Sequence, residues 1–331
     1  QRTTAWVSDD HGVITDGDCL PGQRVSVDHF VCSTRGRRFN TRGASNDSNM
    51  YAGGCLFYDH ASRYIDVRFQ THLNTHETLQ SKKEFEERCR DFGVIIGSYH
   101  SDNGSCFTSA EYTEHLANFQ QVTSFAGVGA HHANGTAERA IRTITSMART
   151  MMLHQGICWP EMADPMLWPM AVRHAVHIYN HVPHDLITRT RTPTKRLHDL
   201  HVWGCPVYVL HGDLADGKKI PRWKARSQRH VMMGLSEKHH GSAPLVLNPD
   251  TGTITTKFHV VFDDWFATIG TSTTELPPFE STPWSDLFGT TEYHSYDDTD
   301  DHHDDSNGLH DNATPPPIRC QMTRVAANYD H

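Results

Sequence analysis

In Val25-Ser-Val-Asp-His-Phe30, apolar residues alternate with polar ones from Val25 to Asp28, and this short run carries the carboxylate of Asp28. The alternation predicts a strand from Arg24 to Phe30. Two more stretches rich in β-forming residues, 50–58 and 64–69, predict that this strand opens a series. The helix-like stretch 75–92 follows them, so the order of elements predicts an α/β core.

Two further acidic residues occupy equally informative places. Tyr99-His-Ser-Asp-Asn-Gly-Ser105 puts Asp102 just after the apolar run 94–99, which we expect to be a strand. In open α/β sheets, ligand-binding residues often lie past the carboxyl ends of strands. Asn134-Gly-Thr-Ala-Glu-Arg139 opens a predicted helix and carries Glu138 beside an apolar stripe. That stripe consists of Ala137, Ala140, Ile141, Ile144, Met147, Ala148 and Met151.

Three carboxylates that are far apart in sequence but meet in space suit metal-dependent phosphoryl transfer. Two divalent ions about 3.5–4 Å apart neutralise the phosphate and both the attacking and leaving oxygens. Magnesium prefers oxygen ligands. We therefore predict Asp28, Asp102 and Glu138 as catalytic residues and as ligands of two Mg²⁺ or Mn²⁺ ions. Arg142 and Arg149 follow Glu138 on one helix face, as a surface that faces DNA requires.

Each of these features also has an ordinary interpretation. An aspartate before Asn-Gly is often only a turn former. Glu138 and Arg142, four residues apart, also fit a surface ion pair. A rival first carboxylate, Asp59, stands in Tyr58-Asp-His-Ala-Ser62 at the end of the second predicted strand.

Taken together, these motifs resemble the integrase of copia-type LTR retrotransposons, in the retroviral integrase superfamily. Asp102 and Glu138 have 35 residues between them, positions 103–137, which is the spacing of that superfamily's acidic triad. The resemblance extends over about residues 18–268. It includes three later motifs: Trp203-Gly-Cys-Pro-Val-Tyr-Val-Leu210, Leu247-Asn-Pro-Asp-Thr-Gly252 and Phe258-His-Val-Val-Phe-Asp-Asp264.

The resemblance implies Mg²⁺-dependent joining of retroelement DNA ends to target DNA by a homo-oligomer in the nucleus, after a cytoplasmic virus-like particle. It favours Asp28 over Asp59 as the catalytic residue of the first strand. Asn134 and Gly135 would shape the entry to the Glu138 helix and bind DNA there, and Arg142 and Arg149 would position the DNA end. Family members carry an N-terminal zinc module, so we expect this chain to be a fragment or a decayed copy.

The resemblance implies a ribonuclease H-like mixed five-stranded sheet with flanking helices, followed by a small SH3-like β-barrel, and the composition adds a disordered acidic tail. A helix at 170–181 would close the core, and the loop 33–49 would form an extended hairpin. The domain boundaries we expect are an N-terminal extension at 1–20, the core at 21–185, a linker at 186–198, the β module at 199–269 and the tail at 270–331.

Charge is distributed unevenly along the chain. The net charge is −9, while residues 271–331 alone hold 12 acidic and 2 basic residues, a net of −10 that leaves +1 for residues 1–270. The tail is too charged and too poor in apolar residues to fold alone. In the β module, by contrast, a basic loop surrounds Trp223, which would either stack on bases or pack. Its predicted DNA-binding residues are Lys218, Lys219, Arg222, Lys224 and Arg226.

Cysteine usage and hydropathy set further bounds. The eight cysteines include no C-x-x-C pair, so we expect reduced thiols rather than a disulfide frame or zinc site. No apolar run reaches the roughly 18 residues that span a bilayer, and we expect no membrane partner. Two other functions stay open: a catalytically silent remnant that binds nucleic acid, and a cut-and-paste transposase of the same fold.

Overall fold

The computed structural model describes residues 19–39, 49–125, 134–182, 200–236, 239, 243–270, 275–285 and 287. The chain divides into two compact units, residues 1–290 and 291–331, and all of the second unit lies outside the described residues. The expected linker at 186–198 and most of the expected N-terminal extension lie outside them as well.

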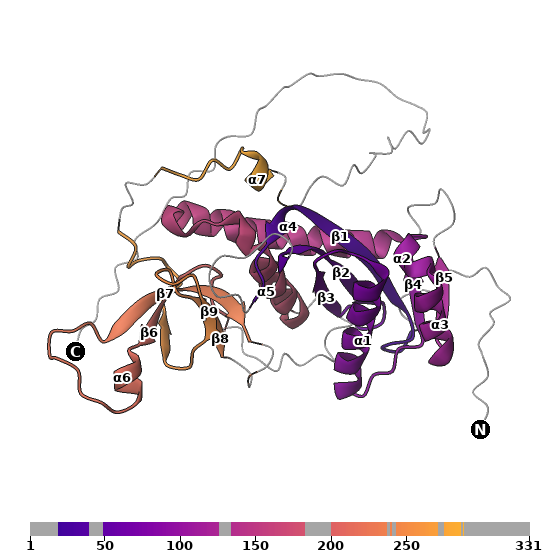
Figure 1. Cartoon of the computed structure of the whole chain (residues 1–331), viewed down its shortest axis with the longest axis horizontal. Coiled ribbons are helices and arrows are strands. Elements are labelled where there is room, and N and C mark those ends of the chain that lie inside the picture. The colour runs from indigo at the N-terminus through magenta and orange to yellow at the C-terminus, as the bar shows by residue number, and fades with distance from the viewer. Residues whose placement is uncertain are drawn as a thin grey trace, which may run out of the picture. The chain divides into compact units, whose positions relative to one another are not determined.

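The first sheet is mixed and five-stranded, as the sequence predicts (Figure 1). Its spatial order is β3-β2-β1-β4-β5, which places β1 in the centre. β1 pairs antiparallel with β2, and β2 with β3, whereas β4 runs parallel to both β1 and β5. This is the ribonuclease H-like arrangement. The strands are β1 (Val25–Gly36), β2 (Tyr51–Asp59), β3 (Ile65–Gln70), β4 (Ser98–Ser101) and β5 (Val122–Phe125).

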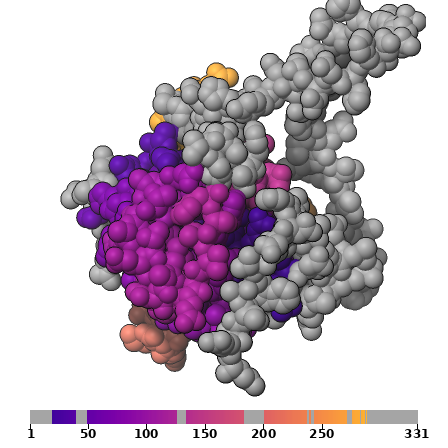
Figure 2. Space-filling model, turned by 90° about the vertical axis from the view of Figure 1, so that its right-hand side faces the viewer, coloured from indigo at the N-terminus to yellow at the C-terminus, as the bar shows by residue number. Residues whose placement is uncertain are grey.

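Helices cover both faces of this sheet because its strands bury side chains in two directions. Val25 and Val27 belong to an apolar cluster with residues of α1 and α3, while Phe30 belongs to a second cluster with residues of α4 and α5. The helices of this part are α1 (Thr75–Asp91), α2 (Ser105–Thr108), α3 (Ala110–Asn118), α4 (Gly135–Cys158) and α5 (Trp168–His181), with the 3₁₀ turns η3 (Pro160–Met162) and η4 (Pro165–Leu167) before α5. Figure 2 views the end of the molecule that carries β4 and β5.

A second five-stranded sheet follows, with the order β10-β6-β7-β8-β9 and antiparallel pairing throughout, which is compatible with an SH3-like module. Its Trp203 and Val207 share an apolar cluster with Met170 of α5. Gly204 has φ +78°, and a Cβ there would lie 2.2 Å from Cγ of Gln155, so only glycine fits this approach to α4. The elements are β6 (Pro206–Leu210), α6 (Gly212–Ala215), β7 (Ser227–Leu235), β8 (Pro244–Leu247), β9 (Ile254–Thr256) and β10 (Val260–Phe262).

Two local predictions are corrected. The apolar run 94–99 is not one strand, because β4 begins only at Ser98. Val94 instead closes the end of α1 by donating its N–H to Cys89 O, and Ile95 is 81% exposed. The loop expected from Ser33 begins later, since β1 continues to Gly36, and residues 40–48 lie outside the described part of the chain.

The acidic tail expected from residue 270 contains a packed segment at its start. Trp284, in α7 (Thr282–Ser285), is 5% exposed and Leu287 is fully buried in the cluster formed by α4 and α5. Phe279 packs against Gly156 of α4. These apolar side chains precede the acidic run, so charge averaged over the tail concealed them. Within the described residues, no helix has the length and apolar character to cross a bilayer.

Candidate metal centre

Asp28 points to the face of β1 that α4 covers. Side chains alternate along a strand, and Val25 and Val27 face α1, so Asp28 takes the opposite side with Phe30. Asp28 is partly buried. Its Oδ1 accepts a hydrogen bond from the N–H of His29 at 2.8 Å. The central strand therefore holds this carboxylate rigidly at the α4 side of the sheet.

Asp102 follows β4, the parallel neighbour of β1. The register pairs Val25 with Tyr99 and Ser26 with His100. If that register is continued by two residues, one past the end of β4, Asp102 lies level with Asp28, and neighbouring strands are about 4.8 Å apart. The Oδ1 of Asp102 accepts from the N–H of Gly104 at 3.1 Å, which fixes the carboxylate in the turn. Asp102 can therefore form the turn that Asn-Gly indicates and still present a carboxylate oxygen to an ion.

Glu138 lies in the first turn of α4, whose N-cap is Asn134. Asn134 is 1% exposed, and its Nδ2 donates to Val27 O at 3.2 Å, which ties the start of the helix to β1. Its Oδ1 is buried and has no hydrogen-bond partner. The interaction between Asn134 and β1 brings Glu138 to the same side of the sheet as Asp28.

The pKa of Asp28 reflects the charges of the neighbouring carboxylates. Burial, then the charges of Asp102 and Glu138, raise the pKa of Asp28 to about 7, although bonds from His29 N–H and the Asn134 side chain oppose the rise. Like charges raise a carboxyl pKa when they lie close together and share no cation. The structure therefore brings all three predicted carboxylates into one electrostatic group.

The donor chemistry of this group fits a hard divalent ion. All three side chains offer oxygen, the ligand atom that magnesium prefers. The Asn134 side chain hydrogen-bonds Asp28, and its own Oδ1 is buried without a hydrogen-bond partner. Within the described residues, no group of three or more His, Cys, Asp or Glu side chains is placed so that it could hold a metal ion as it stands. The carboxylates of Asp28, Asp102 and Glu138 are the oxygen donors available at this place.

Asp59, the rival first carboxylate, has a different role. It is 5% exposed, with Oδ1 accepting from the N–H of Gly22 at 2.8 Å and Oδ2 from the N–H of Ser62 at 2.7 Å. Both carboxylate oxygens accept backbone hydrogen bonds, as those of a turn-forming aspartate do.

The seven cysteines in the described part of the chain are all free thiols.

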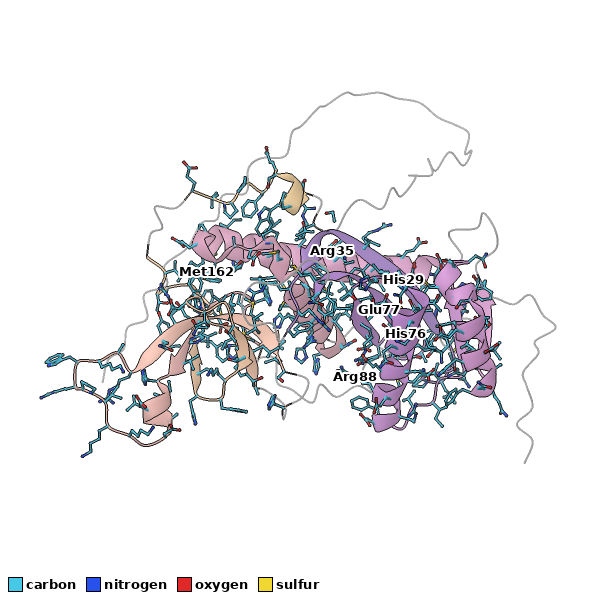
Figure 3. All side chains as sticks on the ribbon, viewed as in Figure 1. His29, Arg35, His76, Glu77, Arg88 and Met162 are labelled. Atoms are coloured by element: carbon cyan, nitrogen blue, oxygen red, sulfur yellow. The ribbon has the colours of Figure 1, made fainter. Side chains whose placement is uncertain are left out.

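Sequence reasoning missed one residue beside the centre, His29. Burial lowers its pKa to about 4, although Asp102 acts in the opposite direction, so its ring is neutral at pH 7. Figure 3 labels His29 together with His76 and Glu77 of α1, the helix that His29 contacts through Thr78. The only sequence signal was its place in the alternation, on the face opposite Asp28.

Of the predicted DNA-binding residues, Asn134 is 1% exposed and Gly135 is half-buried, and the others lie on two surfaces. Arg142 and Arg149 are exposed on α4, the helix that carries Glu138. The five basic residues of the loop 218–226 are exposed on the β module. Trp223 is 93% exposed, which excludes the packing role and leaves it available for stacking. Lys218 lies 3.7 Å from carboxylate oxygens of both Asp213 and Asp216.

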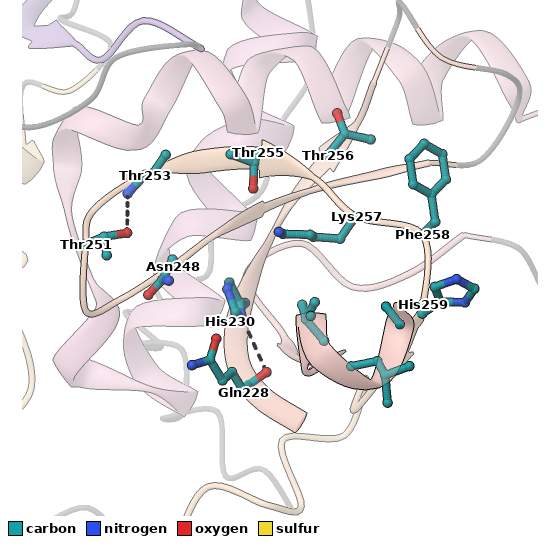
Figure 4. Close-up of a pocket in the computed structure, with 14 residues that line it drawn as sticks. Gln228, His230, Asn248, Thr251, Thr253, Thr255, Thr256, Lys257, Phe258 and His259 are labelled. Carbon is teal, nitrogen blue, oxygen red and sulfur yellow. Dashed lines mark hydrogen bonds between the residues drawn. The ribbon is translucent and has the colours of Figure 1, made fainter. Parts of the chain in front are cut away.

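The β module also has an open groove of about 830 Å³ (Figure 4). Threonine hydroxyls, amides and histidines line it together with Lys257, and no carboxylate does. His230, which lines it, uses Nδ1 to contact Gln228 O at 3.2 Å. Without carboxylates this groove does not suit a magnesium centre. The three carboxylates on the first sheet offer the oxygen donors that this groove lacks.

Comparisons with known proteins give the following. No protein-family model matches the sequence. Among solved structures, the chain is similar to the catalytic core of HTLV-2 integrase in complex with magnesium, at 16% identity over 50% of this chain and 90% of that chain, with a TM-score of 0.34. It is also similar to the catalytic core of BIV integrase, at 12% identity, 50% and 88% coverage and a TM-score of 0.36.

A third similar structure is the simian T-cell lymphotropic virus intasome in complex with PP2A regulatory subunit B56 gamma. It shows 13% identity over 73% of this chain and 78% of that chain, with a TM-score of 0.37. Similarities at these scores carry no argument about function. The fold assignment therefore rests on the strand order and pairing described above.

Proposed function

We propose that this chain is a copia-type retrotransposon integrase that joins element DNA 3′ ends to target DNA, acting as a homo-oligomer in the nucleus. The observation that carries the proposal is the electrostatic group of Asp28, Asp102 and Glu138 at the centre of a ribonuclease H-like sheet. Three oxygen donors from a central strand, its parallel neighbour and a covering helix are what two-metal phosphoryl transfer requires.

In the proposed mechanism, Asp28, Asp102 and Glu138 would hold two Mg²⁺ or Mn²⁺ ions. When bound, such ions would supply charge to activate water or a DNA 3′-hydroxyl and to stabilise the leaving oxygen. Asp28 must give up its proton to serve as a ligand, since its pKa is about 7 without a cation. Asn134 fixes the start of α4 against β1, and Gly135 begins the helix. Arg142 and Arg149 contact DNA phosphates along that helix.

The β module supplies a second DNA surface in this proposal. The basic residues of the loop 218–226 bind phosphates without reading sequence, and Trp223 stacks on an exposed base. A module of this kind directly after the core supports an integrase over a cut-and-paste transposase.

The test is strand transfer by the purified chain, with a short duplex of the element's terminal sequence, supercoiled plasmid and Mn²⁺. Glu138→Ala should reduce joining on the order of a thousandfold while DNA binding is kept, because several kcal/mol of charge stabilisation is lost. Glu114→Ala, an exposed glutamate of α3, is the matched control and should stay active.

Two outcomes would favour the other functions. A wild type that binds DNA but does not join it supports the silent remnant. Excision of an intact element from a donor plasmid supports the transposase.

A further inference from the structure

A cluster that the proposed mechanism does not use lies on the α1 side of β1, behind Asp28. The ring of His29 stacks on that of Phe107, with centroids 4.7 Å apart and planes inclined by 24°. The Nε2 of His29 lies 2.9 Å from Oγ1 of Thr78 in α1. The two contacts connect the strand of the first carboxylate to two helices at once.

A second hydrogen bond of Thr78 shows which residue donates in its contact with His29. Thr78 Oγ1 donates its only proton to Asn74 O at 2.8 Å, where Asn74 is the N-cap of α1. The oxygen of Thr78 must then accept from His29, so the neutral imidazole carries its proton on Nε2. A directed chain of two hydrogen bonds thus runs from β1 into the first turn of α1 and fixes the plane of the His29 ring.

The other face of the cluster leads to Asp102. Phe107, in α2, is 1% exposed and makes an edge contact with Tyr112 at 5.7 Å. Its N–H donates to Gly104 O at 3.0 Å, and the N–H of Gly104 donates to Asp102 Oδ1 at 3.1 Å. The backbone of Phe107 is thus hydrogen-bonded to the tight turn at Gly104, which in turn is hydrogen-bonded to the Asp102 carboxylate, so a shift of Phe107 would move that carboxylate.

His29 contacts both acidic elements. Its backbone N–H binds Asp28 Oδ1 at 2.8 Å, and its ring locates the turn that holds Asp102. We propose that His29 is a positioning residue, which sets the separation of the Asp28 and Asp102 carboxylates and thereby the affinity of the centre for a divalent cation. This inference rests on the proposed function, because it assigns His29 to the same centre.

The size of the expected effect follows from other metal sites. Residues that orient ligands without touching the ion usually change metal affinity by about 10- to 100-fold when they are removed. His29→Ala loses both the stack and the bond to Thr78. His29→Phe keeps an aromatic ring on Phe107, and Thr78→Val removes the hydroxyl that accepts from His29 Nε2 and donates to Asn74 O.

The experiment is calorimetric titration of the full chain with Mn²⁺ in the absence of DNA. His29→Ala should raise the dissociation constant by on the order of tenfold or more, and His29→Phe and Thr78→Val should raise it less. His76→Ala is the control, since His76 lies on the same helix with its side chain 83% exposed. Its Mn²⁺ affinity should equal that of the wild type.

Strand transfer gives the second readout. His29→Ala should need more Mn²⁺ for half-maximal joining, while kcat at saturating Mn²⁺ stays within a few fold of the wild-type value. A purely structural His29 would lower the melting temperature and leave Mn²⁺ affinity unchanged, which overturns the inference. If His29→Ala does not fold, Phe107→Leu tests the same stack from α2 with the same expected rise.

Failure of the inference and failure of the proposed function are distinguishable. A wild type that binds no Mn²⁺ contradicts the metal centre itself. A wild type that binds Mn²⁺, together with a folded His29→Ala or Phe107→Leu of equal affinity, contradicts only the role of His29.

Discussion

Two groups of buried charge lie on the first sheet, and they are built in opposite ways. On the α1 side, Lys82 is fully buried, and its Nζ lies 2.7 Å from both Glu86 Oε1 and Gln121 Oε1. Tyr99 of β4 donates its hydroxyl to the same Glu86 oxygen at 2.7 Å. Burial alone would raise the pKa of Glu86, but the bond and charge of Lys82 lower it overall.

On the α4 side, Asp28 has the carboxylates of Asp102 and Glu138 for neighbours, and its pKa is raised to about 7. One group therefore carries its own cation, whereas the other gathers like charges that favour a cation from solution. A self-neutralised network serves the fold, and an uncompensated one is a mark of a functional site. The pKa of Glu86 is lowered and that of Asp28 is raised, and these opposite directions separate the two roles.

The largest effect should come from Asp28→Asn. The substitution keeps the shape of the side chain but removes a charged ligand, so we expect joining to fall on the order of a thousandfold. Stability without metal should rise, since one of three crowded charges is gone. Urea unfolding at pH 8 without metal, alongside the strand-transfer assay, checks both. Clear destabilisation by Asp28→Asn would mean that this carboxylate serves the fold, and the contrast between the groups would disappear.

Lys82→Met should show the reverse pattern. Breaking a buried ion pair by removing one partner leaves the other charge uncompensated and usually costs about 3–5 kcal/mol. We expect a loss of that order in urea unfolding, with unchanged Mn²⁺ affinity in the folded protein. Lys83→Met, at the exposed neighbouring position of α1, is the control and should leave stability nearly unchanged. Equal stability of the two variants would show that the network contributes little.

The two groups should also respond to pH with opposite signs. The folded pKa of Asp28 is raised, so the folded protein binds more protons than the unfolded chain between about pH 4 and 7. Its contribution is present below that window and is lost as pH rises through 7. Glu86, with its lowered pKa, contributes above its unfolded pKa and loses that contribution as pH falls.

Unfolding free energies of wild type and Asp28→Asn, measured without metal from pH 5 to 8, isolate the Asp28 contribution. The difference between the two unfolding free energies should reach on the order of 2 kcal/mol at pH 8. The raised pKa alone would give more, but solvent screens a partly exposed site. Mg²⁺ should remove this difference. The wild-type and Asp28→Asn values must be subtracted because His174 also changes stability over this range. Burial lowers the pKa of His174 to about 4, so the folded protein loses stability as pH falls below 6.5. A flat difference curve would contradict the crowding of charges at Asp28.

Much of the fold could be predicted because periodicity reports burial. The alternation around Asp28 predicted β1, and the apolar stripe beside Glu138 predicted α4. The run 94–99 misled because apolar residues also close helix ends, as Val94 does. Trp284 was missed because a few apolar residues ahead of an acidic run leave the average composition polar.

The site was less accessible to sequence reasoning than the fold. Carboxylate types and order indicated Asp102 and Glu138, but only strand register brings Asp102 level with Asp28. His29, Thr78 and Phe107 come from three separate elements, and no spacing in the chain announces their contact. Positioning contacts of this kind depend on tertiary packing, which a single sequence does not encode in any local pattern.

The smallest effect concerns charges that belong to neither buried group. Arg149 is exposed on α4, so it should act only through DNA phosphates, and Arg149→Ala should lower the salt slope of DNA binding by about 1. Lys218→Ala should lower it less, because Asp213 and Asp216 lie 3.7 Å from its ammonium and already compensate part of its charge. Fluorescence anisotropy of a labelled duplex over a series of KCl concentrations measures both slopes. An unchanged slope for Arg149→Ala would remove α4 from the DNA path and leave the β module as the phosphate-binding surface.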